Sequence, residues 1–328
     1  MSAALKTATD APIIRVRDLV KDFHVTRGRG GPPAVLRAVN HISFDLRPGT
    51  TLGLVGESGS GKSTTGRLLV GLIPATSGEI SLFGETITGA GGEAALAKVR
   101  SKLQFVFQDP HGSLNPRMRV GDCIAEPIDI AGGWSRKDRA DRVSELLETV
   151  GLPRGVAERF PHEFSGGQRQ RIGIARALAL RPDFVVCDEP VSALDVSMQA
   201  QIINLLLDLQ ERLGLSYLFI AHDLAVVRSI ATDVAVMYAG ALVEQAPKTV
   251  LYSAPKHPYT QALLDAVPRP DPDRVRSAAL GGEVPSILNP PPGCAFAARC
   301  PQAMDMCRQE RPAARPTGDG HVVACHLY

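Results

Sequence analysis

The sequence predicts an α/β fold in which helices cover a parallel sheet, and three observations lead to that prediction. Short apolar runs bounded by turn residues occur at 51–55, 183–188 and 217–222, as expected of strands buried on both faces of a sheet. Helical patterns with leucine-rich faces lie between them, at 142–152 and 199–214. Strands that alternate with helices favour a layered α/β architecture.

Two further regions surround this core. Residues 13–24 alternate apolar and polar side chains, and 41–46 do so again after a Gly/Pro-rich loop, so the chain is expected to open with antiparallel β structure. The stretch 109–180 is mainly helical in pattern and predicts a helical subdomain. From about residue 268 the composition becomes rich in proline and then in cysteine, which predicts a separate, small C-terminal element.

Size and charge limit the class of protein. The chain has 328 residues, enough for one large domain or two smaller ones with their own cores. Its 36 Lys and Arg nearly balance 34 Asp and Glu, so no whole-molecule field is available for nucleic acid, and we expect no nucleic-acid partner. The first residues, MSAALKTATDAP, lack a secretory signal pattern, and no later window offers about 18 uncharged apolar residues. These features predict a cytosolic protein whose cysteines are thiols or metal ligands.

A glycine-rich loop directly after the first buried run predicts a nucleotide site. Residues 56–63 fit the pattern G-x-x-x-x-G-K-[ST]. The glycines let backbone amides turn inward, and the following helix begins with the positive end of its dipole at the same point. Lys62 is expected to reach the β and γ phosphates, and Ser63 to bind Mg²⁺. The predicted nucleotide-binding residues of this loop are Gly56, Glu57, Ser58, Gly59, Ser60, Gly61, Lys62, Ser63 and Thr64.

Two acids at the end of a second buried run fit the same site. Asp188 and Glu189 follow the apolar residues 184–187, at the carboxyl end of a strand, where ligands of α/β sheets lie. Asp188 suits Mg²⁺ binding through water, and Glu189 suits polarising the attacking water. Acids at a strand end can also be simple helix caps, but Pro190 forces a turn directly after them and favours the site.

A second helix start carries the same kind of chemistry. Ser165, Gly166, Gly167 and Gln168 open a basic helix and form another anion-binding helix start. Because the chain already has one phosphate loop, we expect this second start to serve a nucleotide held by a partner molecule. Two ATP molecules would then lie between two such domains.

With these motifs in this order, the sequence resembles the ATPase subunits of ABC transporters over about residues 12–250. The resemblance implies a P-loop NTPase fold with a RecA-like parallel sheet core, an antiparallel β subdomain and a helical subdomain, and an ATPase that uses ATP and Mg²⁺. The matching segments are 56–63 for Walker A, Gln108 for the Q-loop, 164–168 for the signature, Asp188 and Glu189 for Walker B, 192–195 for the D-loop, and His222 for the switch histidine.

The resemblance also implies roles for individual residues. Gln108 would join Mg²⁺ to a helical subdomain that moves when nucleotide binds. His222 would donate to the γ phosphate, although a lone histidine at a strand end is otherwise an ordinary polar residue. Asp195 would lie at the dimer interface. Phe23 is the candidate for stacking on adenine, and a simple core position is the equally open alternative because the insertion RGRGGPP blurs the match. Phe164 stands where the family more often has leucine.

Three further segments resemble the dipeptide and oligopeptide importer branch: 104–118, 162–180 and 256–264. The GKST ending of the phosphate loop and SLNPRM resemble the F-type of its two ATPase subunits. This implies a heterodimer with a D-type ATPase, two membrane permeases and a solute-binding protein, and a peripheral position at the cytoplasmic face of the inner membrane. Peptide is the expected cargo, with nickel, glutathione or another small solute left open. A soluble ABC ATPase acting on DNA or ribosomes, and an iron-sensing regulatory subunit, are the remaining alternatives.

The expected C-terminal extension, residues 251–328, carries the cysteines Cys294, Cys300, Cys307 and Cys325 with the spacing C-x5-C-x6-C-x17-C. Four thiolates can bind Zn²⁺ or an iron-sulfur cluster, but this spacing matches neither short zinc-finger pairs nor the ferredoxin run. Some proteins of the branch that the chain resembles have such a tail and hold a [4Fe-4S] cluster, so that occupant is expected ahead of free thiols and zinc. His257 and His326 are possible further ligands, with surface positions as the simpler expectation. Cys187 is expected in the core.

Overall fold

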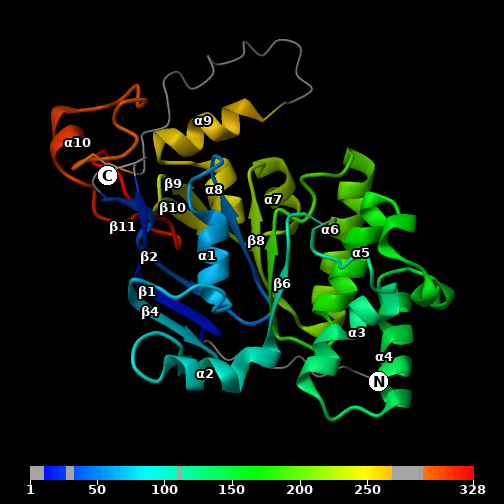
Figure 1. Ribbon diagram of the computed structural model, residues 1–328. Coiled ribbons are helices and arrows are strands. Elements are labelled where there is room, and N and C mark those ends of the chain that lie inside the picture. Colours follow the sequence, from blue (N-terminus) through cyan, green and yellow to red (C-terminus); the bar gives the residue numbers. More distant parts are fainter. Residues whose placement is uncertain (1–10, 27–32, 110–111, 268–287, 289–290) are drawn as a thin grey trace. The chain divides into compact units, whose positions relative to one another are not determined.

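The computed structural model of the chain describes residues 11–26, 33–109, 112–267, 288 and 291–328 (Figure 1). Most of the Gly/Pro-rich insertion at 27–33 and the change of composition at about 268 lie outside the described residues. The described residues form two compact units, one within 97–220 and the other made of 11–96 and of the described residues from 221 onward.

The first unit contains three parallel strands in the order β6-β7-β8. Every residue of β7 (Phe184–Asp188) and β8 (Ser216–Ala221) is buried, which confirms the two apolar runs as strands covered on both faces. The other elements of this unit are η1 (Arg100–Lys102), β6 (Leu103–Val106), α3 (Val120–Ala131), α4 (Arg136–Thr149), η2 (Arg154–Glu158), η3 (Pro161–Glu163), α5 (Gly166–Ala177) and α6 (Val196–Leu213).

The helices of this unit begin and end at identifiable caps. Ser135 Oγ accepts a hydrogen bond from the Asp138 amide at 3.1 Å, so α4 begins several residues earlier than the expected 142–152. Helix α6 begins after the capping residue Asp195 and ends at Gly214, which has a left-handed backbone (φ 69°). Helices α4 and α6 therefore start after polar side chains that accept hydrogen bonds from backbone amides, and their apolar pattern begins only later.

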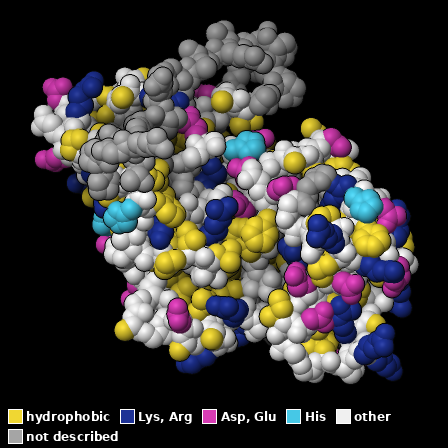
Figure 2. Space-filling view, in the orientation of Figure 1, with side chains coloured by type: hydrophobic (Ala, Val, Ile, Leu, Met, Phe, Trp, Pro, Cys, Tyr) yellow, Lys and Arg dark blue, Asp and Glu magenta, His cyan; other side chains and the backbone are white. Residues whose placement is uncertain are grey.

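Helices α3, α4 and α5 pack against one another (Figure 1). They occupy the stretch 109–180, whose described residues include no strand. On the face drawn in Figure 2, positive and negative side chains alternate over these helices without a patch of one sign. The boundaries of the helical subdomain within this stretch stay a prediction.

The second unit contains two sheets. One has the strand order β2-β1-β4-β5 and is antiparallel. In the other, β3 pairs in parallel with β9, and β9, β10, β12 and β11 continue it as antiparallel pairs. The elements are β1 (Ile14–Thr26), β2 (Pro33–Leu46), β3 (Thr51–Val55), α1 (Lys62–Leu69), β4 (Ser77–Leu82), β5 (Glu85–Thr86), α2 (Gly92–Val99), α7 (Leu224–Ile230), β9 (Asp233–Tyr238), β10 (Ala241–Pro247), α8 (Lys248–Ser253), α9 (Pro258–Ala266), α10 (Asp305–Gln309), β11 (Arg315–Pro316) and β12 (Val322–Val323).

The expected antiparallel opening of the chain is confirmed, but its second strand is longer than the pattern indicated. Strand β2 begins at Pro33, whereas the alternation predicted a strand only over 41–46. The reason is the pairing with β1, whose register runs from Ile14 opposite Leu46 to Thr26 opposite Pro33 with shifts along the way. These shifts lie between Arg37 and Phe44 of β2, so the alternation over 41–46 does not continue in step into the residues before it.

A buried carboxylate anchors the C-terminal extension on β10. Glu244, with 1% of its surface exposed, accepts hydrogen bonds from the amides of Lys256 (2.7 Å) and His257 (3.0 Å). Nε2 of His321, itself 2% exposed, lies 2.6 Å from Glu244 Oε1. Buried charges are stable only when they are paired and hydrogen-bonded, so this one side chain fixes the start of α9 and the strand pair β11–β12 to the same strand. The extension follows α8 and runs from yellow to red in Figure 1.

The packing of α7 on β3 depends on a glycine in the strand. A Cβ atom at Gly53 would lie 2.3 Å from Val227 Cγ1 and 3.1 Å from Ala231 Cβ. We expect Gly53→Ala to lower the free energy of unfolding by about 1–3 kcal/mol, because the stiff, buried Val227 has to move. Chemical denaturation of the full chain measures this change.

The control is the same substitution at Gly173, in the interior of α5, where no atom lies within 4 Å of the added Cβ. Gly173→Ala should leave stability unchanged or raise it by up to about 1 kcal/mol through helix propensity. A Gly53→Ala protein as stable as Gly173→Ala would contradict the packing described here.

Candidate functional site

The phosphate loop is pressed between two backbone segments, and this explains its glycines. A Cβ atom at Gly56 (φ 155°) would lie 2.1 Å from the carbonyl oxygen of Met237 at the end of β9. A Cβ at Gly61 (φ 101°) would lie 2.1 Å from the carbonyl oxygen of Ala38 in β2. Backbone atoms cannot swing aside as a side chain can, so only glycine fits at either position. The loop therefore has a fixed path at both of its ends.

Lys62 lies inside this loop at the start of α1. It is 4% exposed, and its Nζ donates hydrogen bonds to the carbonyl oxygens of Gly56 (2.7 Å) and Glu57 (2.9 Å). The residue before it, Gly61, offers no side chain to cap α1. The ammonium group of Lys62 therefore lies among the loop carbonyls at the amino end of α1, where the helix dipole is positive and favours an anion. Ser63 and Thr64 follow in the first turn of the same helix.

Sequence analysis missed two side chains that hold this loop. The Glu57 amide donates to the hydroxyl oxygen of Tyr259 in α9, at 2.9 Å. The Glu57 carboxylate accepts two hydrogen bonds from the guanidinium of Arg299, at 2.8 and 3.0 Å. Both partners belong to the C-terminal extension, more than 200 positions away along the chain. Tyr259 lies in the segment 256–264 that resembles the importer branch, but the resemblance assigned it no role, and no motif includes Arg299. The one signal in the sequence is Glu57 itself, because an acidic residue in a phosphate-binding loop favours a cationic partner.

The first unit brings Glu189 and Gln108 together. Gln108 Nε2 donates to Glu189 Oε2 at 2.8 Å. Glu189 follows the buried strand β7, whose last residue Asp188 is 2% exposed. The backbone of Glu189 is left-handed (φ 45°), which is uncommon for a residue other than glycine. Its amide donates to the carbonyl of Ile220 (3.0 Å), and its carbonyl accepts from the Ser192 amide (3.3 Å), so the surroundings hold this conformation.

The signature segment starts α5 with a reciprocal cap. Ser165 Oγ accepts from the Gln168 amide at 3.4 Å, and Gln168 Oε1 accepts from the Ser165 amide at 3.0 Å. A Cβ atom at Gly167 would lie 2.0 Å from Met198 Cε in α6, so this glycine allows the two helices to touch. Ser165 and Gln168 are exposed, as a site offered to a partner molecule requires. Phe164 points inward with 5% exposure, beneath the guanidinium of Arg159 at 4.7 Å from its ring centre.

The other residues predicted from the resemblance lie at the surface. Asp195 is exposed and caps α6: its carboxylate accepts from the Met198 amide (2.9 Å) and the Ser197 hydroxyl (2.7 Å), and these bonds hold the pKa of Asp195 below its usual value. His222 is exposed directly after β8.

Phe23 is 36% exposed on β1, with Lys21 Nζ 4.9 Å from its ring centre, so the core alternative for Phe23 is wrong. Its stacking on adenine stays a prediction.

The four cysteines of the tail, spread over residues 294–325, line one cavity. Its volume is about 10 Å³, which is room for about one water molecule. Burial raises the pKa values of the Cys294, Cys300 and Cys325 thiols, so these groups are neutral without a metal. In the part of the chain that the structure describes, no three His, Cys, Asp or Glu side chains are arranged to hold a single metal ion.

Two histidines border the same cavity, and one of them differs from the expectation. His257 is 1% exposed, not a surface residue: its Nδ1 accepts from the Tyr259 amide at 3.1 Å and caps α9. Burial lowers its pKa to about 4, because the apolar surroundings disfavour the imidazolium. His326 is half-buried, with Nε2 2.9 Å from the carbonyl oxygen of Glu310. Cys187, at 0% exposure in β7, is confirmed as core.

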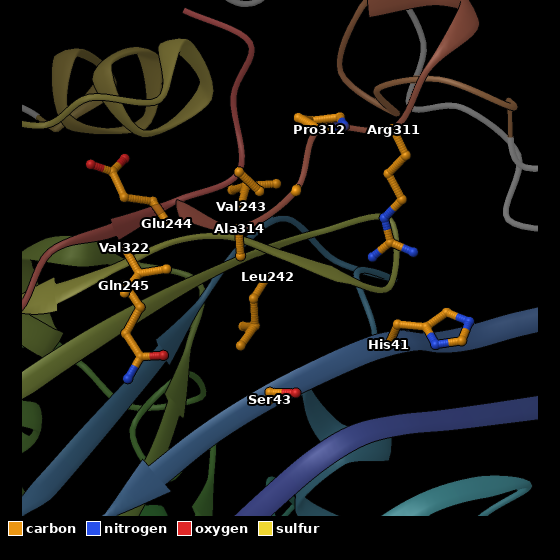
Figure 3. Close-up of a pocket in the computed structure, with 12 residues that line it drawn as sticks. His41, Ser43, Leu242, Val243, Glu244, Gln245, Arg311, Pro312, Ala314 and Val322 are labelled. Carbon is orange, nitrogen blue, oxygen red and sulfur yellow. The ribbon is translucent and has the colours of Figure 1, made fainter. Parts of the chain in front are cut away.

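A larger cavity, about 310 Å³, lies between β2, β10 and residues 311–324 (Figure 3). In this view the Arg311 guanidinium and the His41 side chain lie on the same side of the cavity. Both polar groups have partners within the chain: Arg311 donates to the side-chain and backbone oxygens of Asn40 (2.9 and 2.8 Å), and His41 Nδ1 lies 2.7 Å from Asp18 Oδ1. None of the residues predicted for nucleotide, metal or catalysis lines this cavity.

The solved structures similar to this chain are ATP-binding cassettes. The ATP-binding cassette MJ0796, as a dimer in a post-hydrolysis state bound to ADP and Pi, is 28% identical, with a TM-score of 0.63 over 72% of this chain and 98% of that one. CbiO1 from Clostridium perfringens, part of the ABC transporter complex cbiONQ, is 24% identical and has a TM-score of 0.63 over 74% and 91% of the chains. These likenesses confirm the predicted cassette fold.

Sequence comparison points to the same family. The ABC transporter profile matches residues 39–192, and the profile of the oligopeptide/dipeptide transporter C-terminal region matches residues 243–307. A Brucella abortus protein whose name assigns it to peptide import and ATP binding is 63% identical over 96% of this chain and 94% of its own length. A Brucella ovis protein with the same kind of name is 49% identical over 97% and 98%. The chain belongs to the ATP-binding proteins of the ABC transporter family.

Proposed function

We propose that this chain hydrolyses ATP to drive the import of peptides through an ABC transporter. The observation that carries the proposal is the phosphate loop, where Lys62 lies at the start of α1 among the carbonyls of Gly56 and Glu57. The C-terminal match to the oligopeptide/dipeptide transporter region, together with relatives named for peptide import, supports peptide as the cargo. ATP with Mg²⁺ is the usual nucleotide of this family.

The proposed roles fall on residues of this chain and on a partner ATPase. Lys62 and the amides of the glycine loop would hold the phosphates, and Ser63, Asp188 and Gln108 would hold Mg²⁺. Glu189 would orient and polarise the attacking water, and His222 would contact the γ phosphate. The exposed signature helix start would close over the nucleotide held by the partner. Glu189 is already oriented by its hydrogen bond from Gln108, which supports the pair acting together.

We further propose the partners and the place of work. The partner is a D-type ATPase, and the two subunits would dock on a pair of membrane permeases supplied by an external solute-binding protein. The chain would then be peripheral, at the cytoplasmic face of the inner membrane. Among the described residues, no helix is both long enough and apolar enough to span a bilayer.

For the cysteine cavity, we propose a [4Fe-4S] cluster ahead of zinc. Four thiols of the extension that line one cavity support the cluster. Among the described residues no three side chains are arranged around a single ion, so neither a cluster nor zinc has a preformed site there. The cavity of about 10 Å³ is smaller than a cluster, so the thiols would have to move apart and lose their protons on loading.

Glu189 gives the first test of the catalytic proposal. Glu189→Gln should slow ATP turnover by about 10²–10⁴-fold while Mg-ATP binding stays near the wild-type affinity, because the water loses its polarising carboxylate and the phosphate loop is unchanged. The assay is ATP hydrolysis by the assembled transporter. Glu145→Gln, at an exposed position of α4, is the control and should keep wild-type turnover. Unchanged turnover in Glu189→Gln would refute the role given to Glu189.

Ser165 tests whether the signature serves a partner's nucleotide. Ser165→Glu places a negative charge where a phosphate is expected, so turnover by the assembled transporter should fall by at least about tenfold. ATP binding to the isolated full chain should not change, because its own phosphate loop is intact. Ser135→Glu is the matched control: Ser135 also caps an exposed helix through the amide three residues on, but belongs to no proposed site. Equal losses in both variants would assign the effect to the lost cap.

The cysteine cavity has its own test. Protein purified without oxygen should absorb broadly in the visible range and contain about four iron and four sulfide ions per chain if the cluster is present. Cys307→Ser should abolish both signals, whereas Cys123→Ser, a buried cysteine of α3, should keep them. Colourless wild-type protein with stoichiometric zinc, or with no metal, would overturn the cluster.

A further inference from the structure

The C-terminal extension holds the second residue of the phosphate loop through two independent contacts. One is the hydrogen bond from the Glu57 amide to the Tyr259 hydroxyl, at 2.9 Å. The other is the paired hydrogen bond from Arg299 to both carboxylate oxygens of Glu57. Paired arginine–carboxylate contacts fix direction as well as distance, since two parallel bonds allow little rotation. Together they fix the Glu57 peptide from its amide and from its side chain.

Arg299 reaches the loop through a buried aromatic cluster. Its side chain is 5% exposed, and its Nη1 also donates to the Tyr238 hydroxyl at 3.2 Å. Tyr238, Tyr259 and Phe296 are each at most 1% exposed and meet in edge-to-face or tilted contacts with ring centres 4.6–5.4 Å apart. The guanidinium lies 5.8 Å from the Tyr238 ring centre and 6.0 Å from that of Phe296. Such packing leaves the arginine few alternative positions, and the neighbouring carboxylate raises its pKa, so it stays charged.

The held residue is directly connected to the phosphate-binding lysine. The Glu57 carbonyl accepts one of the two short hydrogen bonds from Lys62 Nζ. A shift of the Glu57 backbone would therefore displace the carbonyl that accepts from the lysine, together with the peptide groups on both sides of this residue. Because a phosphate cradle binds through amides that are already oriented, loosening this peptide should weaken nucleotide binding more than it slows chemistry.

The extension's own fold determines where Arg299 lies. The arginine directly precedes Cys300, and its amide donates to the Phe296 carbonyl at 2.9 Å. The Cys294 amide, at the start of the same turn, donates to the Cys307 carbonyl at 2.7 Å. The segment that carries two cysteines of the cavity thus also carries the arginine that holds the phosphate loop.

We propose that Arg299, assisted by Tyr259, is a positioning residue that orders the phosphate loop for nucleotide, so that the cysteine-bearing extension sets the affinity of the chain for ATP. The proposal rests on the nucleotide site proposed above. Neither residue touches the nucleotide: Arg299 acts through the Glu57 carboxylate, and Tyr259 acts through the Glu57 amide.

The test compares Arg299→Gln with Arg311→Gln in the full chain. Arg311 is the matched control, because it also anchors the extension by two hydrogen bonds from one guanidinium, but to Asn40 in β2 and not to the phosphate loop. Arg299→Gln should weaken Mg-ATP binding, measured by titration calorimetry, by about tenfold. Arg311→Gln should stay within about twofold of wild type. Arg299→Lys, which keeps the charge without the paired geometry, should recover part of the loss.

A second measurement separates a positioning role from a catalytic role and from a loss of folding. In the assembled transporter, Arg299→Gln should raise KM for ATP by about tenfold and leave kcat within about twofold, since saturating nucleotide reorders the loop. Tyr259→Phe, which removes a single oxygen, keeps the test informative if Arg299→Gln does not fold, and should weaken binding by about threefold.

The outcomes are distinct. Unchanged ATP affinity in Arg299→Gln, or equal losses in Arg299→Gln and Arg311→Gln, would overturn the positioning role while leaving the ATPase function in place. If Arg299→Gln does not fold, unchanged affinity in Tyr259→Phe would overturn it. A wild-type chain that binds no ATP would overturn the proposed function and this proposal with it.

Discussion

The structure depends on a steric constraint: the phosphate loop passes so close to other backbone segments that two of its residues cannot carry a side chain. The neighbours of Gly56 and Gly61 are carbonyl oxygens of β9 and β2, and neither can rotate away. Both strands are therefore as important to the nucleotide site as the loop motif itself. Strand β9 also ends in Tyr238, so the same strand that confines the loop on one side builds the aromatic cluster behind it.

The C-terminal extension is attached to the second unit by polar contacts made in a largely apolar setting. Glu244 binds two backbone amides and His321 from a fully buried position, and Arg299 binds Glu57 from behind three aromatic rings. Buried contacts of this kind contribute little net stability compared with apolar packing, but a lost partner leaves an uncompensated charge. These polar contacts therefore favour one arrangement of the extension over other arrangements that would bury a similar amount of apolar surface. An extension held in this way can impose a geometry on the loop that it contacts.

Much of the fold followed from the sequence, and the reasons for the exceptions are physical. The buried runs identified β3, β7 and β8, because strands covered on both faces need continuous apolar residues. Helix starts were placed too late, although Ser135 and Asp195 could have been recognised as capping residues. The length of β2 was missed because register shifts interrupt its alternation. The local motifs predicted the phosphate loop, but Tyr259 and Arg299 contact it only through tertiary packing, and the burial of His257 arises in the same way.

The contact between Gly167 and Met198 has a mechanical consequence. Gly167 is the second residue of α5, and Met198 lies in the first turn of α6, directly after the segment 192–195. The end of the Met198 side chain lies against the Gly167 backbone, in the place that a Cβ atom would occupy. Movement of either helix start is therefore expected to displace the other through this methionine, so the signature and the segment 192–195 are coupled when a partner subunit approaches or withdraws.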